Sequence, residues 1–231
     1  MSWKRWIPIA AVLLCALAAS ASVEGARRLT FDVFLDERPI GVQRFGLETT
    51  SNGLRVEVDA AFQLRVLRIT AFSYEHRNVE LWRDGCLHSI ESRTNSNGTP
   101  YRVKGSAAGD AFLVSNGAGE QRLAECVGTF AYWDKRELLQ RSKLLNSQTG
   151  DYVNVAARAL GPGKLKLGDR ELPVERYELR GRDLAIQLAY SAETGEWVAL
   201  DSEVAGGRTL RYRRSAGELR EFDRAGLVGT R

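Results

Sequence analysis

The chain has 231 residues, of which 33 are lysine or arginine and 29 are aspartate or glutamate. Two of the basic residues, Lys4 and Arg5, lie in the first 21 residues, so the remainder carries 31 basic against 29 acidic residues. Nucleic-acid-binding proteins normally present a strongly basic face or tail, and this near balance therefore excludes a nucleic-acid partner.

The N-terminal segment has the order of a secretory signal peptide. Lys4 and Arg5 precede the apolar run Trp6–Leu17, and small residues follow it. Ala19-Ser20-Ala21 fits a cleavage site, and the run is shorter than the roughly 20 residues of a membrane-spanning helix. We therefore expect residues 1–21 to be a signal peptide, with an uncleaved anchor as the alternative. Cleavage would leave no transmembrane span, and the protein would be periplasmic or secreted, in a bacterium.

Alternating apolar and polar residues begin at Leu29–Leu35 and are longest at Leu54–Val66, where every even-numbered residue is apolar. This period predicts β-strands with one buried and one solvated face. The longer segment would span roughly 40 Å, which suggests a strand that bends around a core. The same pattern returns in residues 184–190, 198–204 and 210–212.

Short turn sequences separate these segments, and Asn-Gly and Asp-Gly pairs supply the positive φ angles of tight hairpins. The turns are Ser51-Asn52-Gly53, Asp84-Gly85, Asn97-Gly98, Thr194-Gly195 and Gly206-Gly207. About a dozen strands with short connections predict a mainly β protein, with a strongly curved antiparallel sheet or an incomplete barrel in meander order. We expect residues 22–231 to form this single domain.

Cys86 and Cys126 are the cysteines that remain if the leader is removed, because Cys15 lies inside it. A lipoprotein signal has a small residue before its cysteine, whereas Leu14 precedes Cys15, so lipid attachment is not expected. In an oxidising compartment Cys86 and Cys126 can form a disulfide. The alternative is two separately buried thiols.

His76 and His88 are the two histidines, and they flank the Asp84-Gly85 turn. A two-residue loop would place Leu81 opposite His88, and the histidines would then point to opposite sides of the sheet. A shared metal site is therefore not expected, and surface or hydrogen-bonded strand histidines are the simpler interpretation.

Motifs of known catalytic sites are missing from the sequence, including the Gly-x-Ser-x-Gly elbow, the phosphate loop, His-Glu-x-x-His and Cys-x-x-Cys. A carboxylate pair such as Glu75 and Glu91 could meet across strands, but solvated sheet faces carry many carboxylates. We therefore expect a protein that is not an enzyme and that needs no metal or cofactor.

Residues 134–146 break the period of two and predict an amphipathic helix of three turns. Asp134 can accept a hydrogen bond from the backbone of Glu137, as in a capping box. Leu138, Leu139 and Leu145 gather on one helical face, with basic residues on the other. This leucine face should pack on the apolar side of the curved sheet.

Aromatic residues lead into this helix, and amide and hydroxyl residues follow it. Tyr132, Trp133, Asn146, Gln148 and Thr149 could therefore line the mouth of a ligand pocket between helix and sheet. The structural alternative is that Trp133 packs against the helix start, that Asn146 ends the helix and that Thr149 lies in a turn.

Short motifs along most of the chain resemble an uncharacterised family of exported bacterial β-rich proteins, known as a domain of unknown function. The resemblance implies no catalytic residues. It rests on Phe31–Gly41, Tyr74-Glu75-His76, Glu80-Leu81-Trp82, Thr94–Gly98, Tyr132-Trp133, Leu144–Gly150, Arg176-Tyr177, Leu179, Gly181, Trp197-Val198 and Leu210-Arg211-Tyr212.

A long curved sheet around a helix is also similar, at the level of the fold, to the periplasmic lipoprotein carriers, which shield acyl chains in a half-open barrel. We therefore expect a non-enzymatic periplasmic protein that binds a lipid or another apolar ligand between sheet and helix. The alternative is an interaction or structural factor of the cell envelope. It would use a sheet edge or an arginine-rich face formed by Arg208, Arg211, Arg213 and Arg214.

Overall fold

The computed structural model describes residues 26–66, 69–204 and 206–215. The predicted signal peptide, residues 1–21, and Cys15 lie outside these residues. Within the described ranges, no helix is long and apolar enough to cross a membrane.

Strands dominate the described chain. They are β1 (Arg27–Leu35), β2 (Arg38–Thr50), β3 (Gly53–Val66), β4 (Ile69–Arg83), β5 (Cys86–Ser96), β6 (Thr99–Ala108), β7 (Ala111–Ser115), β8 (Glu120–Leu123), β9 (Lys143–Leu145), β10 (Tyr152–Asn154), β11 (Ala156–Leu167), β12 (Arg170–Gly181), β13 (Leu184–Ser191), β14 (Trp197–Val204) and β15 (Arg208–Arg214). Thirteen of these described strands form one sheet, and β9 and β10 form a separate pair. The prediction of a mainly β protein with a large antiparallel sheet is confirmed.

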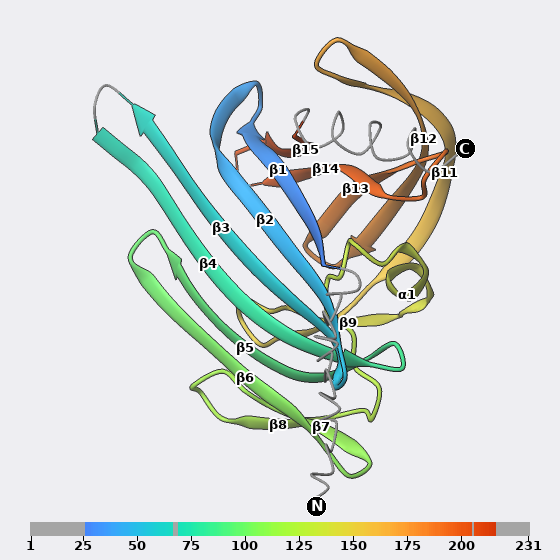
Figure 1. Ribbon diagram of the computed structural model, residues 1–231. Coiled ribbons are helices and arrows are strands. Elements are labelled where there is room, and N and C mark those ends of the chain that lie inside the picture. Colours follow the sequence, from blue (N-terminus) through green and yellow to red (C-terminus); the bar gives the residue numbers. More distant parts are fainter. Residues whose placement is uncertain (1–25, 67–68, 205, 216–231) are drawn as a thin grey trace, which may run out of the picture.

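The sheet has the order β11-β12-β13-β14-β15-β1-β2-β3-β4-β5-β6-β7-β8. Each half is a meander, and the halves join where β1 pairs with β15, with Phe31 opposite Arg214. Strand β8 forms one edge and β11 the other, so the sheet is not closed. In Figure 1 the long strands β3–β6 curve along one side, β11–β13 lie on the other, and α1 and β9 lie between them.

The long predicted strand is present as β3, and its alternation is confirmed. Val56, Val58 and Phe62 are buried on the concave face of the sheet, whereas Glu57 and Gln63 are exposed on the convex face. The alternation places apolar side chains on the buried face of the sheet and polar side chains on the solvent-exposed face, as a period of two requires.

Two predicted hairpin turns have the expected backbone. Asp84 and Gly85 have φ angles of 49° and 75°, and Asn97 and Gly98 have φ angles of 53° and 88°. Each pair forms a two-residue loop between directly paired strands. Asparagine, aspartate and glycine are the residues that adopt such angles at least cost, so these turns fix the pairing next to them, of Arg83 with Cys86 and of Ser96 with Thr99.

The predicted helix over residues 134–146 is wrong in its length. The helix α1 spans Lys135–Gln140, six residues, and Arg141 after it is already extended, with φ −90° and ψ 139°. Asp134 is the N-cap, as predicted, and its carboxylate accepts a hydrogen bond from the Glu137 backbone at 3.1 Å. The capping box is not completed, because the Glu137 side chain lies against Gly85 and Arg141 instead.

Tertiary pairing explains why the helix ends early. Residues Lys143–Leu145 form β9, which pairs with β10, and the Leu145 backbone N–H donates to the carbonyl of Gly128 at 2.8 Å. Of the leucines that suggested a longer helical face, Leu138 in α1 and Leu145 in β9 are buried, whereas Leu139 is half-buried. The extended backbone of β9 therefore buries Leu145, which the predicted helix would also have buried.

The largest hydrophobic cluster lies between the concave face and the crossing segment, which we define as residues 124–155, between β8 and β11. It joins Phe31 of β1, Leu188 of β13, Trp197 of β14, Leu138 of α1 and Leu144 of β9. Complete burial of such a side chain contributes about 1.5–3 kcal/mol. The crossing segment therefore completes the core that the open sheet leaves uncovered.

Candidate functional site

A cavity of about 240 Å³ lies between the concave face and the crossing segment. Its wall combines residues from both halves of the sheet with residues before α1 and after β9. The described residues that line it are Gln43, Phe45, Val58, Tyr74, His76, Asn78, Glu80, Thr129, Phe130, Ala131, Tyr132, Trp133, Asn146, Ser147, Gln148, Leu184, Ile186, Leu200, Ser202, Leu210 and Tyr212.

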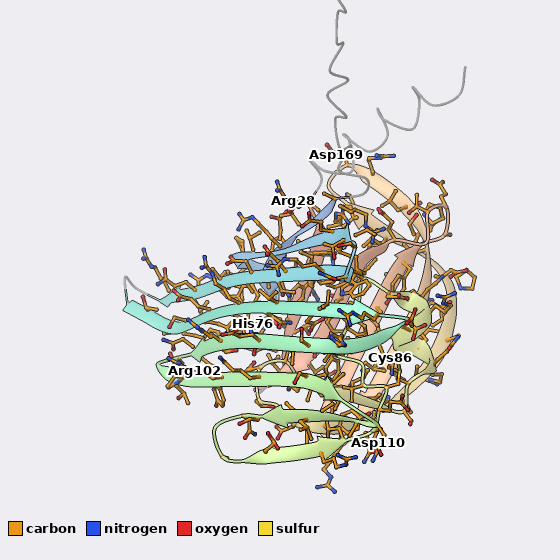
Figure 2. All side chains as sticks on the ribbon, turned by 60° about the horizontal axis from the view of Figure 1, so that its bottom comes forward. Arg28, His76, Cys86, Arg102, Asp110 and Asp169 are labelled. Atoms are coloured by element: carbon orange, nitrogen blue, oxygen red, sulfur yellow. A yellow bond between two sulfur atoms is a disulfide. The ribbon has the colours of Figure 1, made fainter. Side chains whose placement is uncertain are left out.

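One strand, β4, supplies four neighbouring polar residues of the wall. Tyr74, His76, Asn78 and Glu80 are alternate residues of β4, so all four side chains point to the concave face. Figure 2 shows His76 in the middle stretch of this strand. The last three are almost completely buried, at 6%, 3% and 3% exposure. A dry face normally carries apolar residues, so this run of polar residues marks the site.

Glu80 is held by three neutral donors. Its carboxylate accepts hydrogen bonds from Asn78 Nδ2 at 2.7 Å, Trp82 Nε1 at 2.8 Å and Thr129 Oγ1 at 3.3 Å. Burial raises the pKa of Glu80, and these three hydrogen bonds oppose that rise. The described lining contains neither lysine nor arginine, so no basic side chain of the wall compensates this carboxyl group.

Asn78 leaves one acceptor unused. Its amide nitrogen binds Glu80, but its Oδ1 is buried and has no hydrogen-bond partner among the described residues. A buried acceptor without a partner costs about 1–3 kcal/mol. The cavity wall therefore offers a carboxyl group and an unsatisfied amide oxygen on neighbouring positions of one strand face.

His76 is a neutral, hydrogen-bonded residue. Its Nδ1 lies 2.8 Å from Thr94 Oγ1, and burial lowers its pKa to about 4. Burial also raises the pKa of the neighbouring Tyr74 to about 12. Neither side chain is therefore charged near neutral pH.

The pairing predicted around the histidines is wrong by one residue. Leu81 lies opposite Ser89 rather than His88, because a bulge shifts the register between Leu81 and Trp82. Such an insertion reverses which residues share a face beyond it. Across the described chain, no group of three or more histidine, cysteine, aspartate or glutamate residues could hold a metal ion.

The structure brings four of the five predicted site residues to the cavity: Tyr132, Trp133, Asn146 and Gln148. Gln148 Oε1 accepts a hydrogen bond from Tyr74 Oη at 3.1 Å, which joins the crossing segment to β4. The Trp133 ring packs edge-on against Trp82, with centroids 5.4 Å apart.

Thr149 does not line the cavity. Its hydroxyl donates to the Asp151 carboxylate at 2.6 Å, and its carbonyl accepts from Asn116 Nδ2 at 3.0 Å. Both hydrogen bonds hold Thr149 in the turn before β10. This agrees with the alternative interpretation, in which Thr149 is a turn residue rather than a ligand-binding residue.

Sequence reasoning missed His76, Asn78 and Glu80 as a group. The sequence did show that these three polar residues occupy alternate positions of one strand, and so share one face. The residues between them, such as Glu75 and Arg77, are polar as well. Such a segment has no apolar period, so the alternation did not show which side was buried.

A disulfide and an arginine fasten the crossing segment to the β4–β5 hairpin. Cys86 and Cys126 are bonded, with Cα atoms 5.0 Å apart, and the Leu87 N–H donates to the Val127 carbonyl at 2.8 Å. The Arg141 guanidinium donates to the carbonyls of Gly85 at 2.5 Å and Cys126 at 3.1 Å. Figure 2 shows Cys86 at the end of the hairpin near α1.

The arginines of β15 are engaged within the fold. Three of them form ion pairs: Arg208 with Asp36, Arg211 with Glu37 and Arg213 with Asp201. Arg214 is buried and donates to the carbonyl of Arg28 at 3.3 Å. The predicted arginine-rich face is thus interleaved with carboxylates.

Comparisons with known proteins agree with this fold. The chain is similar to a solved structure described as a beta-barrel-like protein of domain of unknown function DUF1849 from Brucella abortus. The TM-score is 0.61, with 11% identity, and the likeness covers 82% of this chain and 95% of that chain. At this identity it shows the fold alone.

No curated protein matches the chain significantly. A family model described as "Domain of unknown function (DUF6134)" matches residues 31–215. This confirms the resemblance to an uncharacterised β-rich family that the sequence motifs indicated. Because the match covers most of the chain, the protein belongs to the DUF6134 family.

Proposed function

We propose that this protein is a non-enzymatic periplasmic protein that binds a lipid or another apolar ligand between the concave sheet and the crossing segment. The observation that carries the proposal is the cavity of about 240 Å³, which the core side chains of both halves leave unfilled. Small-molecule sites are typically concave and combine apolar side chains with placed polar groups, and this cavity is lined by both kinds of residue.

The size of the cavity limits what it can hold. Ligand pockets usually measure roughly 300–1,000 Å³, so a whole diacyl lipid does not fit. A small molecule, or one end of a longer amphiphile, matches the space. Phe45, Val58 and Ile186 would contact its apolar part, and the polar residues of β4 would face its polar end.

Native mass spectrometry of the protein purified from its periplasm tests this proposal, followed by organic extraction. The expected result is a bound species of small mass that the extract identifies. An apoprotein mass that stays unchanged after incubation with envelope lipids and short-chain amphiphiles would refute it.

A pair of variants shows whether a bound species occupies this cavity. Ser202 lines the cavity from β14, whereas the adjacent Glu203 is exposed on the other face. Ser202→Phe should fill the space and abolish binding, and Glu203→Phe should leave binding intact. Equal binding by both variants would place the ligand elsewhere.

The alternative of an envelope interaction factor receives less support. The ion pairs of Arg208, Arg211 and Arg213 occupy the arginine-rich face. The free edges of β8 and β11 remain for this alternative. Strand β8 has only four residues, and Pro162 and a register shift between Ala159 and Gly161 interrupt β11, as in edges that avoid pairing.

A further inference from the structure

We infer that the ligand bears a protonated amine, which the carboxylate of Glu80 and the Oδ1 atom of Asn78 hold at the polar wall of the cavity. This inference rests on the proposed function and names the chemical class of the ligand's polar end. Its basis is the pairing of a buried carboxyl group with an unpartnered acceptor in one cavity.

The first argument is charge. Glu80 is 3% exposed, its hydrogen-bond donors are all neutral, and the described lining contains no lysine or arginine. A buried carboxylate is normally paired with a cation, because burial removes the water that would otherwise stabilise its charge. A ligand cation would supply the missing charge.

The second argument is hydrogen bonding. While Glu80 is ionised, the Oδ1 and Nδ2 atoms of Asn78 cannot exchange places, because the carboxylate oxygen Oε1 needs the Nδ2 donor that lies 2.7 Å away. No described residue supplies a donor to this atom, and a donor on a ligand bound beside Asn78 would satisfy it. A primary ammonium group has three N–H donors and can satisfy Asn78 Oδ1 and Glu80 together.

The third argument is the rest of the wall. Phe45, Phe130, Tyr132, Trp133 and Tyr212 contribute aromatic rings to the lining. Aromatic faces attract a cation that lies over the ring, through the electrostatic field of the ring. An anionic head, by contrast, would meet Glu80 without a basic residue to offset the repulsion. The cavity thus selects against fatty acids and phosphate groups.

Three probes of equal chain length test this inference: hexylamine, hexanol and hexanoate at pH 7. The reporter is the Trp82 indole N–H signal in a ¹H–¹⁵N NMR titration of the mature protein, because this group donates to Glu80. Hexylammonium should bind at least tenfold more tightly than hexanol and should shift the Trp82 signal. Hexanoate should bind most weakly.

Variants assign the preference to a residue. Glu80→Gln should lower the affinity for hexylammonium at least tenfold and leave hexanol binding unchanged. Glu75→Gln is the matched control, because Glu75 lies on the same strand and is exposed on the convex face. It should behave like the wild type, and circular dichroism should show that both variants are folded.

The possible results separate the amine preference from the proposed ligand binding. Equal binding of hexylamine and hexanol to the wild type would overturn the amine preference and leave ligand binding intact. An unchanged preference in Glu80→Gln would overturn the role of Glu80. Binding of none of the probes, together with a native apoprotein mass, would overturn the proposed function as well. The wild-type comparison alone decides the preference if a variant does not fold.

Discussion

Removal of the Cys86–Cys126 disulfide should destabilise the fold by an amount set mainly by loop entropy. The two cysteines are 40 residues apart in sequence. In the chain-entropy model, a closed loop of this size lowers the entropy of the unfolded chain by about 13 cal/mol/K, or about 4 kcal/mol at 25 °C. The double variant Cys86→Ser/Cys126→Ser regains this entropy when it unfolds.

Equilibrium unfolding in urea measures the effect. With an m-value of about 3 kcal/mol/M, a loss of about 4 kcal/mol lowers the midpoint by about 1.3 M. Fluorescence and circular dichroism should give the same midpoint, which supports a two-state analysis. Reductant should shift the wild type toward the variant and leave the variant unchanged.

A loss below about 1 kcal/mol would refute this reasoning. Such a result would mean that the loop between Cys86 and Cys126 gains little freedom in the unfolded chain. The loop contains β5–β8, which are antiparallel neighbours in sequence, and residual pairing among them would be the physical reason.

Three further changes test other parts of the fold. Glu80→Gln should stabilise the protein increasingly as pH rises. Burial raises the pKa of Glu80 in the folded protein, so protonated Glu80 stabilises the fold fully below the ordinary glutamate pKa. This stabilisation is lost as the pH rises from the ordinary pKa through the raised pKa of the folded state. Urea midpoints of the variant and the wild type should diverge across that window, by up to about 1.4 kcal/mol per pH unit, and parallel curves would contradict the shift. Gly41→Ala should cost about 1–3 kcal/mol, because its Cβ would lie 2.0 Å from the Ala61 carbonyl oxygen; Gly46→Ala on the same strand has free space and should cost less than about 1 kcal/mol. Leu138→Ala should cost about 2–5 kcal/mol in the same assay, since Leu138 is 1% exposed, and a smaller loss would mean that α1 contributes little to the core.

The sheet could be predicted because its signals are local. The alternation in Leu54–Val66 required a strand with one buried face, and the Asp84-Gly85 turn fixed a two-residue hairpin. The N-cap at Asp134 was equally local, since it involves Glu137 three residues later. Each of these features depends on atoms close together in the chain.

The rest of the site depended on pairings that the sequence does not display. The helix ends at Gln140 because Leu145 pairs with the backbone of Gly128, a contact outside the helix. The bulge near Leu81 has no sequence pattern of its own, and it moved the facing residues of β5 by one position. The sequence did not show which face of β4 is buried, because Glu75 on one face and Glu80 on the other are equally polar. The curvature of the sheet decides that Glu80 lies on the buried, concave face.

The seam between β1 and β15 determines the order in which the sheet can be completed. Phe31 and Arg214, which face each other there, are 183 residues apart (214 less 31). During synthesis, β1–β8 can pair with their neighbours in sequence as they emerge. The edge of β1 that faces away from β2 stays unpaired until β15 has been made. Closure of so long a loop is slow, and an unpaired central edge is a template for strand exchange with another chain. Loss of β15 would therefore leave one edge each of β1 and β14 unpaired in the middle of the sheet, whereas loss of an edge strand would leave the rest of the sheet paired.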